Sequence, residues 1–315
     1  MLKWLGRIAA ALLVLVGGAG VALYESDIPK AELIALYGGP DSRFVQLASG
    51  ASAHYRDRGP REAPVLLLLH GSNASLHTWE PWAEALAGPY RVVTVDLPGH
   101  GLTGAVPGGG YTQKAMAGFV LEFAAALGLE RFALGGNSMG GGIAARFAIE
   151  HPGRVTRLIL VDAAGFPARA RSEPGLGFRL ARLPLVQNIL LVITPRALFS
   201  ASLRTAIADD GLVTAEMIDR YWRLNRMEGT RSASLARFQS APDPTVRERA
   251  GEIAIPTLVL WGAKDTLIPL DAGEALAAAI PGARLIVYPD AGHVPMEEVA
   301  ARSAADVAAF LSGAK

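Results

Sequence analysis

The sequence predicts an α/β protein, with a mostly parallel central sheet and helices on both of its faces. Three observations indicate this class: apolar runs of strand length recur along the chain, helical stretches separate them, and several runs end in His, Gly or Asp. Strands buried on both faces of a parallel sheet are continuously apolar, because neither face meets water. With 315 residues, 51% of them hydrophobic and 19% charged, the chain can bury a large core.

The predicted strands begin with a hairpin over residues 44–47 and 51–56, with Ser49-Gly50 at its turn. Further apolar runs predict single strands, each joined to the next through a helical or irregular segment. These strands lie at 65–69, 91–95, 132–135, 157–161, 257–261 and 284–288. The helical segments that separate the earlier strands include 82–86, 114–127 and 140–150.

The alternation stops in residues 167–250, which contain no β-rich run but several apolar or amphipathic stretches, at 177–182, 185–193, 197–207 and 217–227. We therefore predict a helical cap inserted before the penultimate strand. Between 169 and 204 it carries six arginines and one acid, which indicates either solvated helix faces or a basic lid on anionic lipid. The full division is a segment 1–25, a linker 26–42, a core of 43–166 and 251–315, and the cap 167–250.

The N-terminal segment predicts a transmembrane anchor. No residue from Ile8 to Leu23 is charged, and with its apolar flanks the run reaches roughly 21 residues, about 30 Å as a helix. Lys3 and Arg7 precede the run and acidic residues follow it. The positive-inside rule then predicts a single-pass membrane protein with a cytoplasmic N-terminus and an extracytoplasmic remainder. The alternatives are a cleaved signal peptide, giving a secreted or periplasmic protein, and a buried core helix.

Composition argues against several other classes. Thirty basic and 29 acidic residues give a net charge of +1, which does not favour a nucleic-acid partner. The chain has no cysteine, so disulfides, thiolate metal sites and a cysteine nucleophile are ruled out. Its six histidines form no dense cluster with acidic residues in the sequence, and we expect neither a metal nor a cofactor.

Ser138 is the candidate nucleophile. It lies in Gly136-Asn137-Ser138-Met139-Gly140, a G-x-S-x-G motif between a predicted strand and a predicted helix. Glycines permit the tight, strained turn that lifts a serine hydroxyl to the edge of a sheet. The helix N-terminus behind the serine favours developing negative charge. The alternative is a purely structural glycine turn.

A serine nucleophile needs a base, and the base needs an acid that orients it. His293 directly follows the last strand, at the sheet edge where Ser138 lies, whereas His151 ends the helix after Ser138. For the acid, Asp265 follows the penultimate strand, which gives the chain order Ser, Asp, His. Asp162 also ends a strand and is the rival, while Asp290 is expected in a turn.

The ordered motifs resemble those of the α/β-hydrolase fold superfamily from residue 43 to the C-terminus. They are His70-Gly71, Asp96-Leu97-Pro98-Gly99-His100-Gly101, the Ser138 turn, Trp261-Gly262-Ala263-Lys264-Asp265 and Gly292-His293. The resemblance implies an oxyanion hole made by the backbone N–H groups of Ser72 and Met139. It also implies that residues 167–250 form a cap over the nucleophile, and that His70 and the Asp96 loop are structural.

Within that superfamily, the Ser138 turn is similar to that of hydrolases that cleave carbon–carbon bonds in meta-cleavage products. Val294 stands where those enzymes usually carry an aromatic residue, and Val294-Pro295-Met296-Glu297 looks more like esterases and lipase-like members. We therefore predict a serine hydrolase that cleaves carboxylic esters of small-molecule or lipid-like substrates. The alternatives are a carbon–carbon hydrolase, a cofactor-free perhydrolase and a non-catalytic binding scaffold. The sequence does not indicate an oligomeric state.

Overall fold

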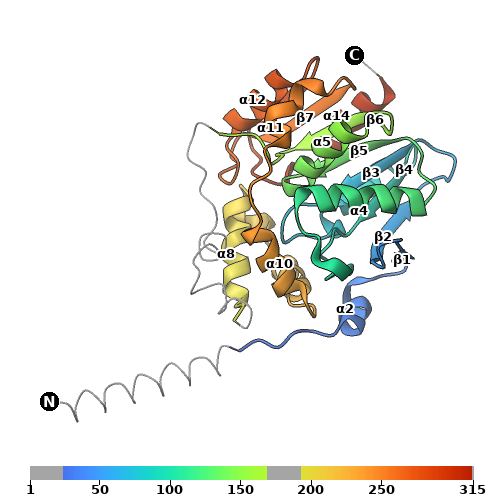
Figure 1. The fold of residues 1–315 in the computed structure, drawn as a ribbon. Coiled ribbons are helices and arrows are strands. Elements are labelled where there is room, and N and C mark those ends of the chain that lie inside the picture. The colour runs from blue at the N-terminus through green and yellow to red at the C-terminus, as the bar shows by residue number, and fades with distance from the viewer. Residues whose placement is uncertain (1–23, 169–192, 314–315) are drawn as a thin grey trace, which may run out of the picture.

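The computed structural model describes residues 24–168 and 193–313, and its centre is an eight-stranded sheet (Figure 1). The strand order is β1-β2-β4-β3-β5-β6-β7-β8. Strand β2 pairs antiparallel with both β1 and β4, and all other neighbours are parallel. The strands are β1 (Arg43–Gln46), β2 (Ser52–Arg58), β3 (Val65–Leu69), β4 (Arg91–Val95), β5 (Phe132–Asn137), β6 (Val155–Val161), β7 (Thr257–Gly262) and β8 (Arg284–Tyr288). The predicted fold class is confirmed.

Strand β3 shows why these strands are apolar throughout. Leu67 and Leu69 belong to the core cluster on the side of helices α4 (Gln113–Ala126), α5 (Met139–Glu150) and α12 (Leu270–Ala279). Leu66 and Leu68 belong to the opposite cluster, with helices α3 (Glu80–Leu86) and α14 (Ala300–Ser312). Successive side chains point to opposite faces, so a sheet between two helical layers buries all four. Each buried leucine contributes about 1.5–3 kcal/mol to folding.

The helices predicted between the strands appear close to their expected positions, as α3, α4 and α5. Helix α13 (Pro295–Glu298) and the short 3₁₀ turns at Leu76–Trp79, Pro107–Gly109, Asp210–Leu212 and Ala250–Glu252 complete the connections. Parallel strands require crossovers, and here helices supply most of them. As a result the carboxyl ends of β5, β6 and β7 lie at one edge of the sheet.

Between β6 and β7 the described chain is helical. It forms α8 (Arg196–Ala206), α9 (Ala215–Leu224), α10 (Thr230–Gln239) and α11 (Thr245–Arg249). Helices α8 and α9 coincide with predicted stretches, whereas α10 was not predicted. The predicted stretch at 177–182, and all of the one at 185–193 except its last residue, lie outside the described residues. We retain residues 167–250 as a proposed cap, and 43–166 with 251–315 as the proposed core.

Part of the segment predicted as a linker is ordered against the cap. Residues 26–42 include helix α2 (Lys30–Tyr37). Just before it, Ile28 donates its backbone N–H to the carbonyl of Arg226, 2.8 Å away. The Asp27 carboxylate also forms an ion pair of 2.9 Å with Arg231 on α10. These bonds connect segments about 200 positions apart, so sequence periodicity had no means of indicating them.

The prediction of a single-pass membrane protein requires correction. Across residues 24–168 and 193–313, no helix combines the length and apolarity that crossing a bilayer demands. Helices of ordinary globular length are too short to span about 30 Å of hydrocarbon. The run from Ile8 to Leu23, on which that prediction was based, lies outside the described residues.

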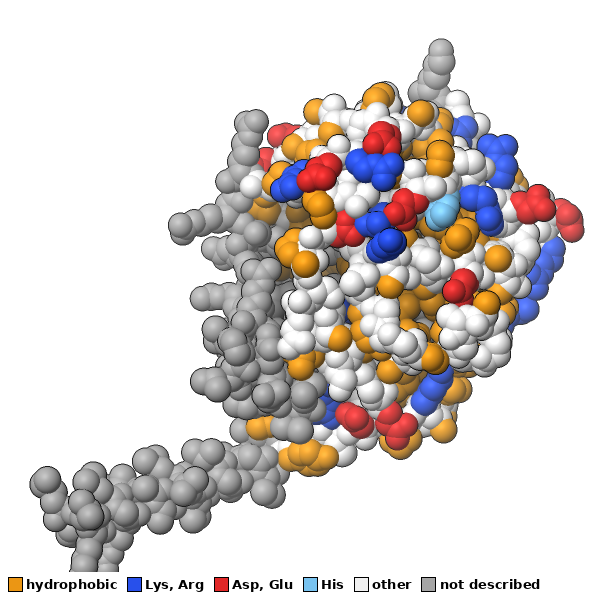
Figure 2. All heavy atoms as spheres, viewed as in Figure 1, with side chains coloured by type: hydrophobic (Ala, Val, Ile, Leu, Met, Phe, Trp, Pro, Cys, Tyr) orange, Lys and Arg blue, Asp and Glu red, His pale blue; other side chains and the backbone are white. Residues whose placement is uncertain are grey.

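The surface charges agree with the near-zero net charge. On the face shown in Figure 2, acidic and basic side chains are intermixed, and several lie in direct contact. Exposed pairs such as Arg249–Glu252 at 2.7 Å are of this kind. A nucleic-acid-binding face is instead dominated by one sign of charge.

Candidate active site

Ser138 lies at a strained turn between β5 and α5. Its backbone adopts φ 53° and ψ −119°, a left-handed conformation that is rare for residues other than glycine. Neighbouring backbone leaves no room for a side chain at Gly136 or Gly140. A Cβ added at Gly136 would lie 2.3 Å from the carbonyl oxygen of Gly140, and one added at Gly140 would lie 2.2 Å from that of Leu69. The turn therefore brings Ser138 tightly against the end of β3.

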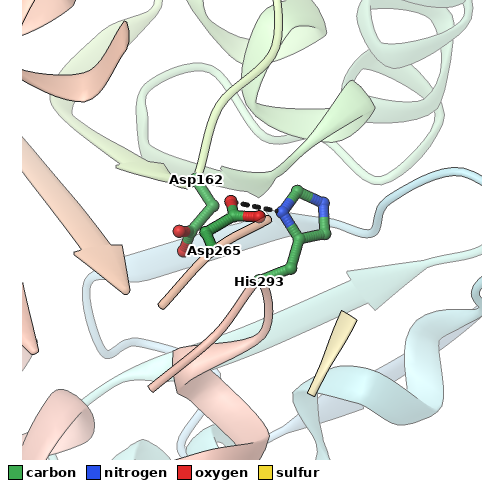
Figure 3. A group of neighbouring side chains, drawn as sticks. All are labelled: Asp162, Asp265 and His293. Carbon is green, nitrogen blue, oxygen red and sulfur yellow. Dashed lines mark hydrogen bonds and ion pairs between the residues drawn. The ribbon is translucent and has the colours of Figure 1, made fainter. Parts of the chain in front are cut away.

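His293 and Asp265 meet in the loops that follow β8 and β7 (Figure 3). Nδ1 of His293 lies 2.7 Å from Oδ2 of Asp265, whose side chain is fully buried. The other oxygen, Oδ1, accepts the backbone N–H groups of Leu267 at 2.8 Å and Ile268 at 3.0 Å. These bonds fix the carboxylate, which in turn orients the imidazole and leaves Nε2 available to a second partner.

Asp162, the rival acid, lies beside Asp265 but makes a different contact. Its Oδ1 accepts the backbone N–H of Gly262 at 3.0 Å, and its Oδ2 is buried without a hydrogen-bond partner among the described residues. Burial, followed by the negative charge of Asp265, raises the pKa of Asp162 well above its usual range. The raised pKa favours the protonated form of Asp162, whereas Asp265 is the carboxyl group that faces the imidazole.

The donor atoms of Asp162, Asp265 and His293 lie within 4.8 Å of one another, which is close enough for all three to contact one metal ion. A carboxyl group must lose its proton to bind a metal, which the raised pKa of Asp162 opposes, and both Asp265 oxygens are already engaged with hydrogen-bond donors. These side chains therefore suit the hydrogen bond between His293 and Asp265 better than they suit a metal site.

The two candidate oxyanion donors lie next to Ser138, the candidate nucleophile, and next to each other. A Cβ added at Gly71 would lie 3.2 Å from Cβ of Ser138, so the loop after β3 passes directly over the turn. The hydroxyl of Ser72 contacts the sulfur of Met139 at 3.4 Å. Met139 is the first residue of α5, and first-turn N–H groups have no acceptor within their own helix.

The loop that carries Ser72 is held by contacts with α9 and α10, which the sequence did not indicate. Asn73 has a left-handed φ of 59°. Its side-chain oxygen accepts a hydrogen bond from Arg237 on α10 at 2.9 Å, and its backbone carbonyl accepts one from Asn225, at the end of α9, at 2.7 Å. Asparagine tolerates left-handed backbone, which is the one local signal that could have singled out Asn73.

These elements surround a cavity of about 470 Å³. Its wall includes Ser138, His293, Ser72 and Met139. Most of the remaining wall is apolar, and its large side chains are Leu198, Phe199, Leu203, Ile207, Tyr221, Leu235, Phe238, Leu267, Ile268 and Val294. Arg231 also lines it, but its guanidinium pairs with Asp27. A pocket of this kind suits an apolar group held beside a few polar atoms.

Outside the cavity, a second serine, histidine and aspartate lie in series. Ser42 Oγ is 2.5 Å from Nε2 of His54, and Nδ1 of His54 is 2.6 Å from Oδ2 of Asp96. Burial acts to raise the pKa of Asp96, but the hydrogen bond and charge of His54 hold it well below its usual range. Ser42 precedes β1 rather than a helix, so it does not lie on a strand-to-helix turn like that of Ser138. We interpret this group as structural.

The remaining candidates lie where the sequence indicated. His151 caps the far end of α5 from Ser138, and the Asp290 side chain is exposed and pairs with Arg302. His70 is fully buried; its Nε2 accepts the N–H of Leu97 at 3.0 Å, and burial lowers its pKa. These three residues therefore have structural positions.

A mostly parallel eight-stranded sheet, with a serine turn between a strand and a helix and a histidine–carboxylate pair at the same edge, defines the α/β-hydrolase class of proteins. The chain belongs to the alpha/beta hydrolase fold family, whose family model matches residues 64–299. This match confirms the resemblance to the superfamily found in the sequence. The likeness to meta-cleavage-product hydrolases is also confirmed, because a solved enzyme of that kind is among the similar structures.

Three similar proteins indicate the range of chemistry among relatives. The 2-hydroxy-6-oxononadienedioate/2-hydroxy-6-oxononatrienedioate hydrolase of Klebsiella pneumoniae is 30% identical over 80% of this chain and 89% of its own. The crystal structure of a membrane phospholipase A covers 100% of this chain and 99% of its own, with 27% identity and a TM-score of 0.76. The enol-lactonase of Burkholderia xenovorans covers 86% and 100%, with 28% identity and a TM-score of 0.72.

Proposed function

We propose that this α/β hydrolase cleaves carboxylic esters, with Ser138 as nucleophile, His293 as general base and Asp265 as the acid that orients it. One observation carries the proposal. Ser138, on its strained turn, and His293, bonded to Asp265, form part of the wall of one apolar cavity. A hydroxyl, an imidazole and a buried carboxylate in that arrangement suit acyl transfer.

The reaction follows from these positions. The Ser138 hydroxyl attacks the ester carbon while its proton passes to Nε2 of His293, and the resulting imidazolium is stabilised by Asp265. The imidazolium then gives this proton to the leaving alcohol, and an acyl-enzyme remains. Water, deprotonated by His293, attacks the acyl-enzyme and releases the carboxylic acid. The imidazolium formed in this second half returns its proton to the Ser138 oxygen as the acid leaves, so His293 ends neutral and the cycle balances without a cofactor.

The backbone N–H groups of Ser72 and Met139 are proposed to bind the oxyanion that forms at each attack. The contact between these two residues and the closeness of Gly71 to Ser138 support this role. Removing one such donor costs about 2.7–4 kcal/mol of transition-state stabilisation in serine hydrolases. The neighbouring contacts of Asn73 with Arg237 and Asn225 keep the loop in place.

The similar proteins support ester cleavage without deciding the substrate. Both the phospholipase A and the enol-lactonase act, by their names, on ester bonds. The apolar wall of the cavity supports an apolar acyl group. The Klebsiella pneumoniae relative supports a second candidate, hydrolysis of a carbon–carbon bond, which uses the same kind of nucleophile and base.

Two measurements test the proposal. A fluorophosphonate probe should label the wild-type protein at Ser138, and Ser138→Ala should lose both the labelling and nearly all ester turnover. Ser42→Ala is the matched control, because Ser42 also contacts a histidine that is bonded to an aspartate. It should keep the labelling. Labelling that persists in Ser138→Ala would refute the assignment.

Substrate choice is then measured with p-nitrophenyl esters of increasing acyl length, beside a 2-hydroxy-6-oxodienoate ring-fission product. Faster turnover of the esters supports the proposal. If only the ring-fission product is cleaved, the carbon–carbon candidate replaces it.

A further inference from the structure

A second cavity, of about 580 Å³, adjoins the first. The two cavities share Ser72, Met139, Ala164 and Phe238 in their walls. Two of these shared residues are the proposed oxyanion donors. The second cavity therefore lies directly beside the proposed oxyanion hole.

The second cavity differs from the first in its charge. Its wall carries Lys114, Arg146 and Arg237 against a single acid, Asp243. Arg146 forms ion pairs with both Asp243 and Glu150, so its charge is fully compensated by carboxylates. Lys114, which is exposed on the first turn of α4, and Arg237 remain without a carboxylate partner among the described residues.

Arg237 is held in place by neutral groups. One Nη donates to Nε2 of His100, and the other donates to Oδ1 of Asn73 at 2.9 Å. Burial, followed by the charge of Arg237, lowers the pKa of His100 well below its usual range, so the imidazole is neutral. Burial also lowers the pKa of Arg237 to about 10, which leaves it protonated at neutral pH.

A desolvated cation without a counter-charge is costly, and the cost is recovered when an anion binds. Gln113 adds a second polar feature to the same wall, because its side-chain oxygen is buried without a hydrogen-bond partner among the described residues. A polar ligand with both an anionic oxygen and a hydroxyl or N–H would satisfy both groups.

We propose that the second cavity is an anion subsite, in which Arg237, assisted by Lys114, binds a carboxylate or phosphate group of the substrate. This inference rests on the proposed ester hydrolysis and narrows its substrate class. The substrate would join an apolar part, held in the first cavity, to an anionic part that lies on the Ser72 and Met139 side of Ser138. The anionic group can belong to the alcohol or to the far end of the acyl chain.

Two pairs of esters distinguish an anionic group on the alcohol from one at the far end of the acyl chain. On the alcohol side, the butanoate ester of 4-hydroxybenzoate is compared with that of its neutral methyl ester. On the acyl side, the 4-nitrophenyl half-ester of glutarate is compared with 4-nitrophenyl pentanoate. The measured quantity is the ratio of kcat/KM, anionic over neutral, within each pair at low ionic strength. A ratio cancels any loss that affects both members, such as a loosened oxyanion loop.

In at least one of the two pairs, Arg237→Gln should lower the kcat/KM ratio about tenfold to a hundredfold, which is the scale of a charge-assisted hydrogen bond. Lys114→Gln should lower it about two- to fivefold, because an exposed charge is screened. Arg237→Lys should keep more of the ratio than Arg237→Gln. Arg302→Gln is the control, since Arg302 is an exposed cation on α14 that pairs with Asp290, and it should leave both ratios unchanged.

The pair that responds identifies the side of the substrate that carries the anion. If both neutral esters are cleaved but neither ratio changes in Arg237→Gln or Lys114→Gln, the anion subsite is refuted and the proposed function stands. If the wild-type protein cleaves none of the four esters, the proposed function fails instead. Should Arg237→Gln not fold, the Lys114→Gln ratio decides the inference.

Discussion

The side-chain amide of Asn137 donates a hydrogen bond to the backbone carbonyl of His293 at 3.0 Å, across a separation of 156 residues. The same amide nitrogen also donates to the carbonyl of Val161 at 3.2 Å. The residue before the nucleophile therefore holds the loop of the proposed base and the end of β6 together. Asn137 is fully enclosed, with 2% of its surface exposed, so water cannot replace these bonds.

From this contact we predict that Asn137→Asp, which keeps the size but loses both donors, lowers ester kcat/KM by about tenfold to a hundredfold. Small displacements of a catalytic group have effects of that size. The loss should appear in kcat more than in KM, since the substitution keeps the size of this wall residue and leaves the apolar wall of the cavity unchanged. Steady-state kinetics beside an unfolding curve separates this effect from instability. Unchanged kcat in a stable variant would contradict the prediction.

The two neighbouring carboxyl groups should respond differently to the same substitution. Asp265→Asn is expected to fold but to lose about 10⁴-fold in kcat, because an amide facing Nδ1 favours the wrong imidazole tautomer. Asp162→Asn changes a carboxyl group that does not face the imidazole and whose pKa is raised well above its usual range, so its kcat should remain within about tenfold of the wild type. Measuring kcat for both variants checks the assignment. A reversed order of effects would make Asp162 the orienting acid.

The turn glycines give a prediction for stability. Gly140→Ala places a Cβ 2.2 Å from the carbonyl of Leu69 and 2.5 Å from that of His70, and neither backbone can move without disturbing β3. We expect a loss of roughly 3 kcal/mol or more in the free energy of unfolding. Gly118→Ala in α4 is the control, since nothing lies within 4 Å of its added Cβ. It should gain about 0.5–1 kcal/mol from helix propensity. Urea unfolding measures both, and equal stabilities would contradict the steric argument.

His77 should make folding sensitive to acid. Burial, followed by the positive charge of Arg56, lowers its pKa from 6.5 to about 4 in the folded chain. The unfolded chain therefore takes up a proton at a higher pH than the folded chain does. The stabilising contribution is complete above about pH 6.5 and is lost as the pH falls towards 4. The loss should be roughly 1.4 kcal/mol between pH 7.5 and 5.5.

This contribution can be isolated with His77→Gln, which has no titrating group. The difference in free energy of unfolding between the wild type and this variant should shift by that amount, in favour of the variant, as the pH falls from 7.5 to 5.5. Urea unfolding at the two pH values measures it. A difference that is independent of pH would show that His77 keeps its ordinary pKa in the folded chain.

Much of the architecture was determined by sequence patterns that act locally. Continuous apolar runs identify strands buried on both faces, and β3 is the clearest case. The glycines around Ser138 identify the turn, because only a residue without a side chain fits between the crossing backbones. Chain order and strand ends also placed Asp265 and His293 at one edge of the sheet, where they form a hydrogen bond. These features depend on short stretches, so they can be seen in one sequence.

The tertiary structure alone decided the contacts between distant segments. It shows Asn137 bonded to the loop of His293 and Asn73 held by α9 and α10. Within residues 24–168 and 193–313, it shows Arg237 without a carboxylate partner. It also shows that Asp265 faces the imidazole and Asp162 does not, although both residues follow the end of a strand. No periodicity encodes such pairings, because they arise where the packed sheet and the helices between β6 and β7 bring remote residues within hydrogen-bonding distance.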